Sequence, residues 1–201
     1  MIHWAGMDIL ETLDELIDPK HTVFLMWDFA KRVIGNAFNS ESMVRNSAKL
    51  LKAAREHHVL TIYSLQNNMH LVGDTGGPTV RMRMKRQNKS LADITKVPEP
   101  VGPFPTPELV EEVKPQKGDI IFDKFAPNAF MGTCFEWWLR KYAIKTIILT
   151  GVNVATGISG TAREATNLGY YAVVVRDCVG TGSEEDYNTA IASLDRLFDV
   201  V

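Results

Sequence analysis

The chain has 201 residues, of which 45% are hydrophobic and 23% are charged. At this length a single domain over residues 1–201 is the default, with a core large enough to need no disulfide or metal. The composition excludes collagen-like, disordered and disulfide-scaffold proteins. Because 22 Lys and Arg residues face 24 Asp and Glu residues, the net charge is −2, which argues against a nucleic-acid partner.

The N-terminal segment and the cysteine count both favour a cytoplasmic protein. The acidic residues within the first 18 positions do not suit a signal peptide, and no apolar run approaches the roughly 20 residues that span a bilayer, so no membrane partner is expected. Two cysteines are too few for a secreted framework. Residues 1–18 are instead predicted to form an amphipathic helix. Its apolar face would hold Ile9, Leu10, Leu13, Leu16 and Ile17.

Apolar runs then alternate with helical segments along the chain. The predicted strands are residues 23–27, 59–65, 119–122, 146–150 and 170–175. The predicted helices are residues 41–57, 108–113, 129–142, 157–168 and 183–198. Strands without clean alternation, each followed by a helix, indicate a parallel sheet covered on both faces. The predicted fold class is therefore α/β, a three-layer, doubly wound, Rossmann-like sheet with helices on both faces.

Residues 66–107 interrupt this pattern with many glycines and prolines. They predict a long loop without much regular structure, and such loops are usually functional or disordered. Within it, residues 80–86 carry four cations. This cluster either binds an anionic substrate or forms a solvated face.

Polar residues follow four of the predicted strands, at the sheet edge where ligands bind in such folds. They are Asp28, Gln66, Lys124 and the turn at residues 151–153. Asp28 follows five apolar residues, so burial should raise its pKa, although an Asp at this position also caps helices. Lys124 would pair with Asp28 or bind an oxyanion, or it is a surface lysine paired with Asp123.

The turn at residues 151–163 joins a predicted strand to a helix and contains three glycines. Backbone N–H groups at a helix start suit an anion or oxyanion. The turn has neither the Walker pattern nor the GxGxxG spacing of a dinucleotide site. The alternative is a tight turn whose glycines serve packing.

The chain resembles a known family, most specifically over residues 123–180, DKFAPNAFMGTCFEWWLRKYAIKTIILTGVNVATGISGTAREATNLGYYAVVVRDCVG. This family is the isochorismatase-like hydrolases, also called the cysteine hydrolase superfamily, and the likeness runs from the strand before Asp28 to the last helix. It implies a catalytic acid at Asp28, a catalytic lysine at Lys124, and a homo-oligomer, either dimer or tetramer. It also implies a non-proline cis peptide at Val152–Asn153. The substrate-binding residues would be Gln66, Phe125, Val152, Asn153 and Thr156.

The third catalytic position departs from the amidase members of this family, because their nucleophilic cysteine falls on Gly157. Without that sulfur a thioester cannot form. Ser159, Thr156 and Cys178 are the alternatives for a displaced nucleophile, whereas Cys134 shares a helix face with aromatic residues and is expected in the core. The histidines form no metal-ligand pattern and the zinc-binding pattern of nicotinamidases is missing, so no metal or other cofactor is expected.

Glycine at this position also resembles the true isochorismatases, which cleave a vinyl ether without a covalent enzyme intermediate. By that analogy Asp28 would protonate the enol ether carbon, water would add, and Lys124 and Gln66 would position polar groups. The substrate is then a small molecule, with an anionic vinyl ether such as isochorismate as one option. Against isochorismate, the turn carries Asn153 and Ala155 where those enzymes carry aromatic and histidine residues.

Two other functions stay open on the sequence. One is an amidase or ureidase-type C–N hydrolase whose nucleophile is displaced, or whose cysteine has been replaced by Gly157, by nature or by engineering. The other is a catalytically silent binding scaffold on the same fold.

Overall fold

The computed structural model describes residues 1–66, 77–88, 90, 92 and 107–201. It contains two compact units, residues 1–66 with 107–201, and residues 67–106. The single domain over residues 1–201 stays a prediction. In the second unit, α4 (Gly77–Gln87) is helical, so the cationic residues 80–86 belong to a helix and not to a loop. The remainder of the segment expected to form a long loop lies largely outside the described residues.

A six-stranded parallel sheet forms the centre of the first unit, in the order β5-β4-β3-β6-β7-β8. The chain builds outward from β3 in one direction and from β6 in the other. This reversal between β3 and β6 is the place where doubly wound folds bind ligands. The strands are β3 (Thr22–Trp27), β4 (Leu60–Gln66), β5 (Ile120–Lys124), β6 (Thr146–Val152), β7 (Tyr171–Gly180) and β8 (Asp199–Val200).

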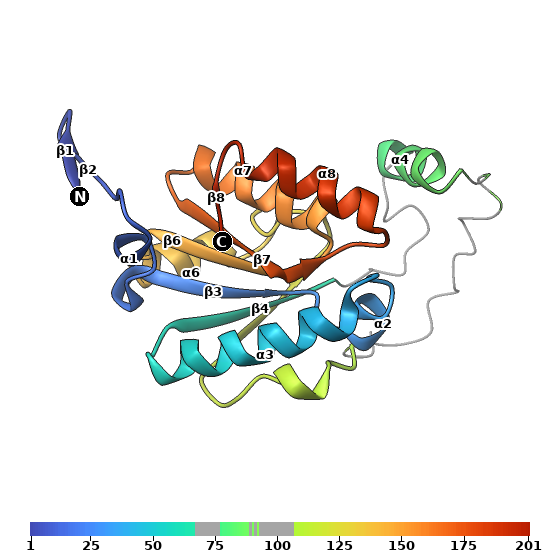
Figure 1. The fold of residues 1–201 in the computed structure, drawn as a ribbon, viewed down its shortest axis with the longest axis horizontal. Coiled ribbons are helices and arrows are strands. Elements are labelled where there is room, and N and C mark those ends of the chain that lie inside the picture. Colours follow the sequence, from blue (N-terminus) through green and yellow to red (C-terminus); the bar gives the residue numbers. More distant parts are fainter. Residues whose placement is uncertain (67–76, 89, 91, 93–106) are drawn as a thin grey trace. The chain divides into compact units, whose positions relative to one another are not determined.

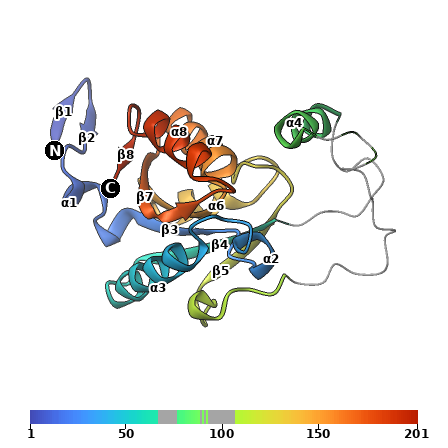
Figure 2. The same cartoon turned by 45° about the vertical axis from the view of Figure 1, so that its right-hand side comes forward.

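Helices cover both faces of this sheet, as Figures 1 and 2 show. Alternate residues of β3 supply the two cores: Val23, Leu25 and Trp27 pack on one face. Phe24 and Met26 pack on the other. The three-layer α/β fold predicted from the sequence is confirmed. The first face carries α6 (Phe135–Lys141), α7 (Ser159–Asn167) and α8 (Glu184–Leu194), and the second carries α2 (Lys31–Ile34), α3 (Ser40–Glu56) and the 3-10 turn η2 (Glu111–Val113).

The predicted N-terminal helix is wrong over most of its length. The chain begins with an antiparallel hairpin of β1 (Ile2–Trp4) and β2 (Met7–Ile9), and only α1 (Leu13–Leu16) is α-helical. Ala5 and Gly6 have φ values of +49° and +81°, the pair of positive values that a tight hairpin turn requires. A 3-10 turn, η1 (Pro19–His21), leads into β3.

The segment before α6 also differs from its prediction, because the helix begins at Phe135 and not near residue 129. The side-chain oxygen of Asn128 accepts hydrogen bonds from the N–H groups of Phe130 and Met131, which favours a turn over a helix. Cys134 is exposed just before α6, so its predicted place in the core is wrong. Within the described part of the chain, no helix has the length and apolar character needed to cross a membrane.

Candidate active site

Asp28 is the first residue after β3, and it adopts a left-handed backbone conformation with φ +53°. Asp tolerates this region better than most residues, at a modest energetic cost. Its N–H donates to the Ser64 carbonyl at 2.9 Å. Both carboxylate oxygens are held, Oδ1 by the N–H of Gln66 at 2.6 Å and Oδ2 by Nζ of Lys124 at 2.7 Å. The carboxyl is therefore fixed in one orientation.

Lys124, at the end of β5, has 0% of its surface exposed. Beside its bond to Asp28, its ammonium donates to Oε1 of Gln66 at 3.0 Å. The same nitrogen lies 4.0 Å from the centroid of the Trp27 ring. Lys124 is thus not a surface lysine paired with Asp123. The structure brings together Asp28, which follows β3, with Gln66 and Lys124, the last residues of β4 and β5.

Burial dominates the electrostatics of this pair. It raises the pKa of the Asp28 carboxyl above its ordinary value, although the charge and hydrogen bond of Lys124 and the N–H of Gln66 oppose the shift. It lowers the pKa of Lys124, against the opposing effect of Asp28. Both charged forms are therefore less favoured than in water. A carboxyl whose pKa is raised by burial holds a proton more readily than a carboxyl in water, which suits a group that gives and takes up a proton.

The turn after β6 contains the cis peptide Val152–Asn153 that the resemblance implies. The side-chain oxygen of Asn153 accepts from the N–H of Ala155 at 2.8 Å. Its carbonyl accepts from the N–H groups of Thr156 and Ile158, at 3.3 and 3.1 Å. These three N–H groups lie in the segment that the sequence predicts as an anion site, but they donate to Asn153 within the turn itself.

Gly157 is buried in a single π-helical turn, η3 (Val154–Ile158), that leads into α7. A Cβ added to it would lie 2.4 Å from Cζ2 of Trp27, so the indole occupies the space where a side chain would begin. Of the other expected site residues, Val152 is buried, Thr156 half-buried and Phe125 48% exposed beside Lys124.

Cys178 is a poor candidate for a displaced nucleophile. It is buried in β7, and burial raises the pKa of its thiol to about 12. Its Sγ contacts Oδ1 of the neighbouring Asp177 at 3.4 Å. The thiolate that would attack a substrate is therefore disfavoured. Among the described residues, no group of three or more His, Cys, Asp or Glu side chains is arranged to hold a metal ion.

Two residues that sequence reasoning missed belong to this site. Trp27 touches both Lys124 and the position of a Gly157 side chain, yet in the sequence it is only the last apolar residue of a buried strand. Arg32, an exposed cation on α2, lowers the pKa of Asp28 through its charge. Its place four residues after Asp28 is the one signal that could have found it.

The sequence profile of the isochorismatase domain family matches residues 22–201. The chain belongs to this family. It is 37% identical over 84 residues to the uncharacterized isochorismatase family protein YwoC of Bacillus subtilis, covering 42% of this chain and 44% of that protein. It is 29% identical over 144 residues to the ureidoacrylate amidohydrolase RutB of Variovorax paradoxus, covering 69% of this chain and 56% of that protein.

A solved structure of an isochorismatase family protein from Desulfovibrio vulgaris matches with a TM-score of 0.73 at 20% identity, covering 90% of this chain and 93% of that one. This similarity shows that the isochorismatase fold is shared. The chain spans about half the length of the curated relatives that it matches. That Gly157 stands at the nucleophile position of the family stays a prediction.

Proposed function

We propose that the chain is a small-molecule hydrolase that acts without a cysteine nucleophile, with Asp28 as general acid and base and Lys124 as its partner. The observation that carries the proposal is the buried contact of 2.7 Å between Oδ2 of Asp28 and Nζ of Lys124. Gln66 contacts both side chains, through its N–H and its Oε1. A lysine and an aspartate are costly to bury, and a site of catalysis is one reason to keep them.

The chemistry that suits this pair is hydrolysis of a vinyl ether. Asp28 gives its proton to the terminal carbon of the double bond, which leaves an oxocarbenium ion. Water adds to the cationic carbon and returns a proton to Asp28. The resulting hemiketal breaks into an alcohol and a carbonyl compound. No bond to the enzyme forms, so a glycine at residue 157 is compatible with every step.

An anionic vinyl ether, such as isochorismate, is the substrate class that we favour. A substrate carboxylate near Asp28 would raise the pKa of this side chain further, which helps proton donation. Arg32, whose charge reaches Asp28, is a candidate to bind that carboxylate. The homo-oligomer implied by the family resemblance also stays a proposal.

The alternative reaction is hydrolysis of a C–N bond, favoured by the likeness to the ureidoacrylate amidohydrolase. In that reaction Asp28 would take a proton from water, or from a displaced nucleophile at Thr156 or Ser159. The third possibility, a silent binding scaffold, leaves the buried Asp28–Lys124 pair without a purpose.

Hydrolysis in water enriched in heavy oxygen tests these functions. The parent protein and Asp28→Asn are each incubated with isochorismate, related enol ethers, small amides and ureides. Mass spectrometry then measures the masses of the products. Asp123→Asn is the matched control, because Asp123 is an exposed acid directly before Lys124. We expect enol ether turnover that is lost in Asp28→Asn and kept in Asp123→Asn.

Other outcomes decide between the alternatives. Amide turnover with an acyl group trapped on Thr156 or Ser159 would establish the C–N hydrolase. Turnover that survives in Asp28→Asn would overturn the role of Asp28. Absence of turnover across the whole panel would favour the binding scaffold.

A further inference from the structure

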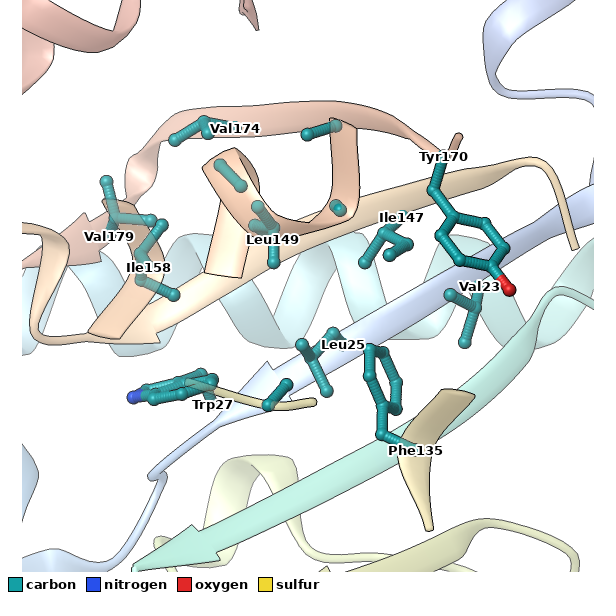
Figure 3. Close-up of a cluster of buried hydrophobic side chains, with 14 of the residues drawn as sticks. Val23, Leu25, Trp27, Phe135, Ile147, Leu149, Ile158, Tyr170, Val174 and Val179 are labelled. Carbon is teal, nitrogen blue, oxygen red and sulfur yellow. The ribbon is translucent and has the colours of Figure 1, made fainter. Parts of the chain in front are cut away.

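Trp27 is one of the largest fully buried side chains of the protein, with 1% of its surface exposed. It closes the core between the sheet and the α6–α8 layer at the end of β3, next to Asp28. Figure 3 shows its indole at the same end of this cluster as Ile158 and Val179. The core therefore leaves this ring little room to move.

The ring lies against Gly157. A Cβ built on this glycine would approach three ring atoms, Cζ2 at 2.4 Å, Cε2 at 2.7 Å and Nε1 at 2.9 Å. All three atoms belong to one rigid, buried group, so no small rotation of a flexible side chain relieves the contact. If a cysteine had been replaced by glycine with nothing else changed, a gap would remain at this place. Instead, the indole fills it.

The same ring also serves Lys124. Two acceptors of its ammonium are oxygens, on Asp28 and Gln66. The Trp27 ring also lies beside it, with the centroid 4.0 Å from Nζ. A π face attracts a cation, most strongly where water is excluded. Trp27 thus touches both the catalytic lysine and the glycine of the site.

We infer that Trp27 is a positioning residue that adapts this site to noncovalent hydrolysis: its indole takes the volume of a side chain at residue 157 and holds the Lys124 ammonium against its π face. The inference rests on the proposed function, in which no bond to the enzyme forms. It implies that Gly157→Cys alone does not create a cysteine hydrolase, because the thiol and the indole compete for one space.

Thermal unfolding of a double-mutant cycle tests the packing. Gly157→Ala should lower Tm by about 3 to 10 °C in the parent, and by much less in a Trp27→Leu background. Gly160→Ala is the matched control, since its added Cβ would lie 2.9 Å from the carbonyl oxygen of Pro127 and not near Trp27. Its effect should be the same in both backgrounds. Equal loss of Tm from Gly157→Ala in both backgrounds would overturn the inference.

Thiol chemistry supplies a second readout, in a Cys134→Ser background that removes the exposed cysteine. Alkylation of Gly157→Cys by iodoacetamide, located by peptide mass spectrometry, should be at least about tenfold slower than that of Gly157→Cys combined with Trp27→Leu. Cys178 gives little background because it is buried. Equal alkylation rates in the two proteins would contradict competition for one space.

An NMR titration of the Lys124 side chain tests the second contact, with its signal assigned by its loss in Lys124→Met. Asp28 is the titratable group that faces the ammonium, and Arg32 acts on Asp28. The pKa of Lys124 should fall in Trp27→Leu and be largely restored in Trp27→Phe, which keeps a π face. If Trp27 only fills space, the pKa of Lys124 will be the same in Trp27→Leu and Trp27→Phe. That result would overturn the inferred contact between the π face and the ammonium.

These three measurements need no substrate, so the inference and the proposed function fail separately. Coupling between Trp27 and Gly157 together with turnover by Asp28→Asn would refute the mechanism and leave the packing relation standing. Absence of coupling together with loss of turnover in Asp28→Asn would refute the packing relation and leave the mechanism standing.

Discussion

Replacement of Lys124 by methionine should leave Asp28 as a buried carboxyl without a cation. Lys124 is fully buried and Asp28 is 6% exposed. The charge and the hydrogen bond of Lys124 both lower the pKa of Asp28, against the larger effect of burial. Without Lys124 the pKa of Asp28 therefore rises further. The folded variant keeps a proton on Asp28 at pH values where the unfolded chain has lost it.

This difference in bound protons fixes the sign of the pH dependence. Above the ordinary pKa of aspartate the folded variant binds more protons than the unfolded chain, so its stability falls as pH rises, by up to about 1.4 kcal/mol per pH unit. The fall ends once pH exceeds the pKa of Asp28 in the folded state. Loss of one partner of a buried pair costs about 3–5 kcal/mol. We expect a loss of this size at pH 8 and a clearly smaller one at pH 5.

Urea unfolding followed by tryptophan fluorescence, at several values between pH 5 and 8, measures this loss. The control is the double variant Lys124→Met with Asp28→Asn, whose site has nearly the same shape and cannot ionise. The difference in unfolding free energy between the single and the double variant must grow with pH. A difference that stays constant from pH 5 to 8 would refute the reasoning, because Asp28 would then carry no burial penalty.

Three further predictions follow from a steric contact, from the burial of a thiol and from the charge of an arginine. Gly151→Ala should lower the unfolding free energy by about 3 kcal/mol or more, measured in urea, because the new Cβ would lie 1.9 Å from the Trp27 carbonyl oxygen at a φ of +108°. Iodoacetamide should modify Cys134 in the folded protein and Cys178 only after denaturation, since only the Cys178 thiol is buried. Peptide mass spectrometry locates the modified residue, and modification of Cys178 in the folded protein would contradict the prediction. Arg32→Gln should raise KM several-fold for anionic substrates and leave KM for neutral ones unchanged in steady-state assays, with the difference shrinking at high salt.

The meeting of Asp28, Gln66 and Lys124 could be predicted from the sequence because it depends on topology. A parallel sheet gathers the carboxyl ends of its strands at one edge, and β3, β4 and β5 are neighbours in that sheet. The direction of the pKa shift of Asp28 was also predictable, since five apolar residues precede it. Neither inference needs the position of a particular atom. Both follow from where the backbone leaves the core.

The N-terminal hairpin and Cys134 show what such patterns leave open. Apolar residues over a short segment fit a helical period and a strand period alike. The structure has a hairpin there, with positive φ values at Ala5 and Gly6 in its turn. The sequence pattern predicts a core position for Cys134 on a helix face, but the helix begins only at Phe135. In both places a local turn, set by one or two residues, changed which side chains are buried.

Trp27 shows why the site itself could not be completed from the sequence. The pattern of β3 fixes which face of the sheet this residue lies on, but not which atoms its ring meets across the fold. A glycine at residue 157 reads in sequence as a missing nucleophile, whereas in the structure it is also the space that an indole requires. These two interpretations of Gly157 predict different results when a cysteine is introduced there. If the site lacked only a sulfur atom, Gly157→Cys alone would supply it. In this structure the Trp27 ring occupies the space of that side chain, so Trp27 would have to be replaced as well. Replacement of Trp27 would also remove its contact with Lys124.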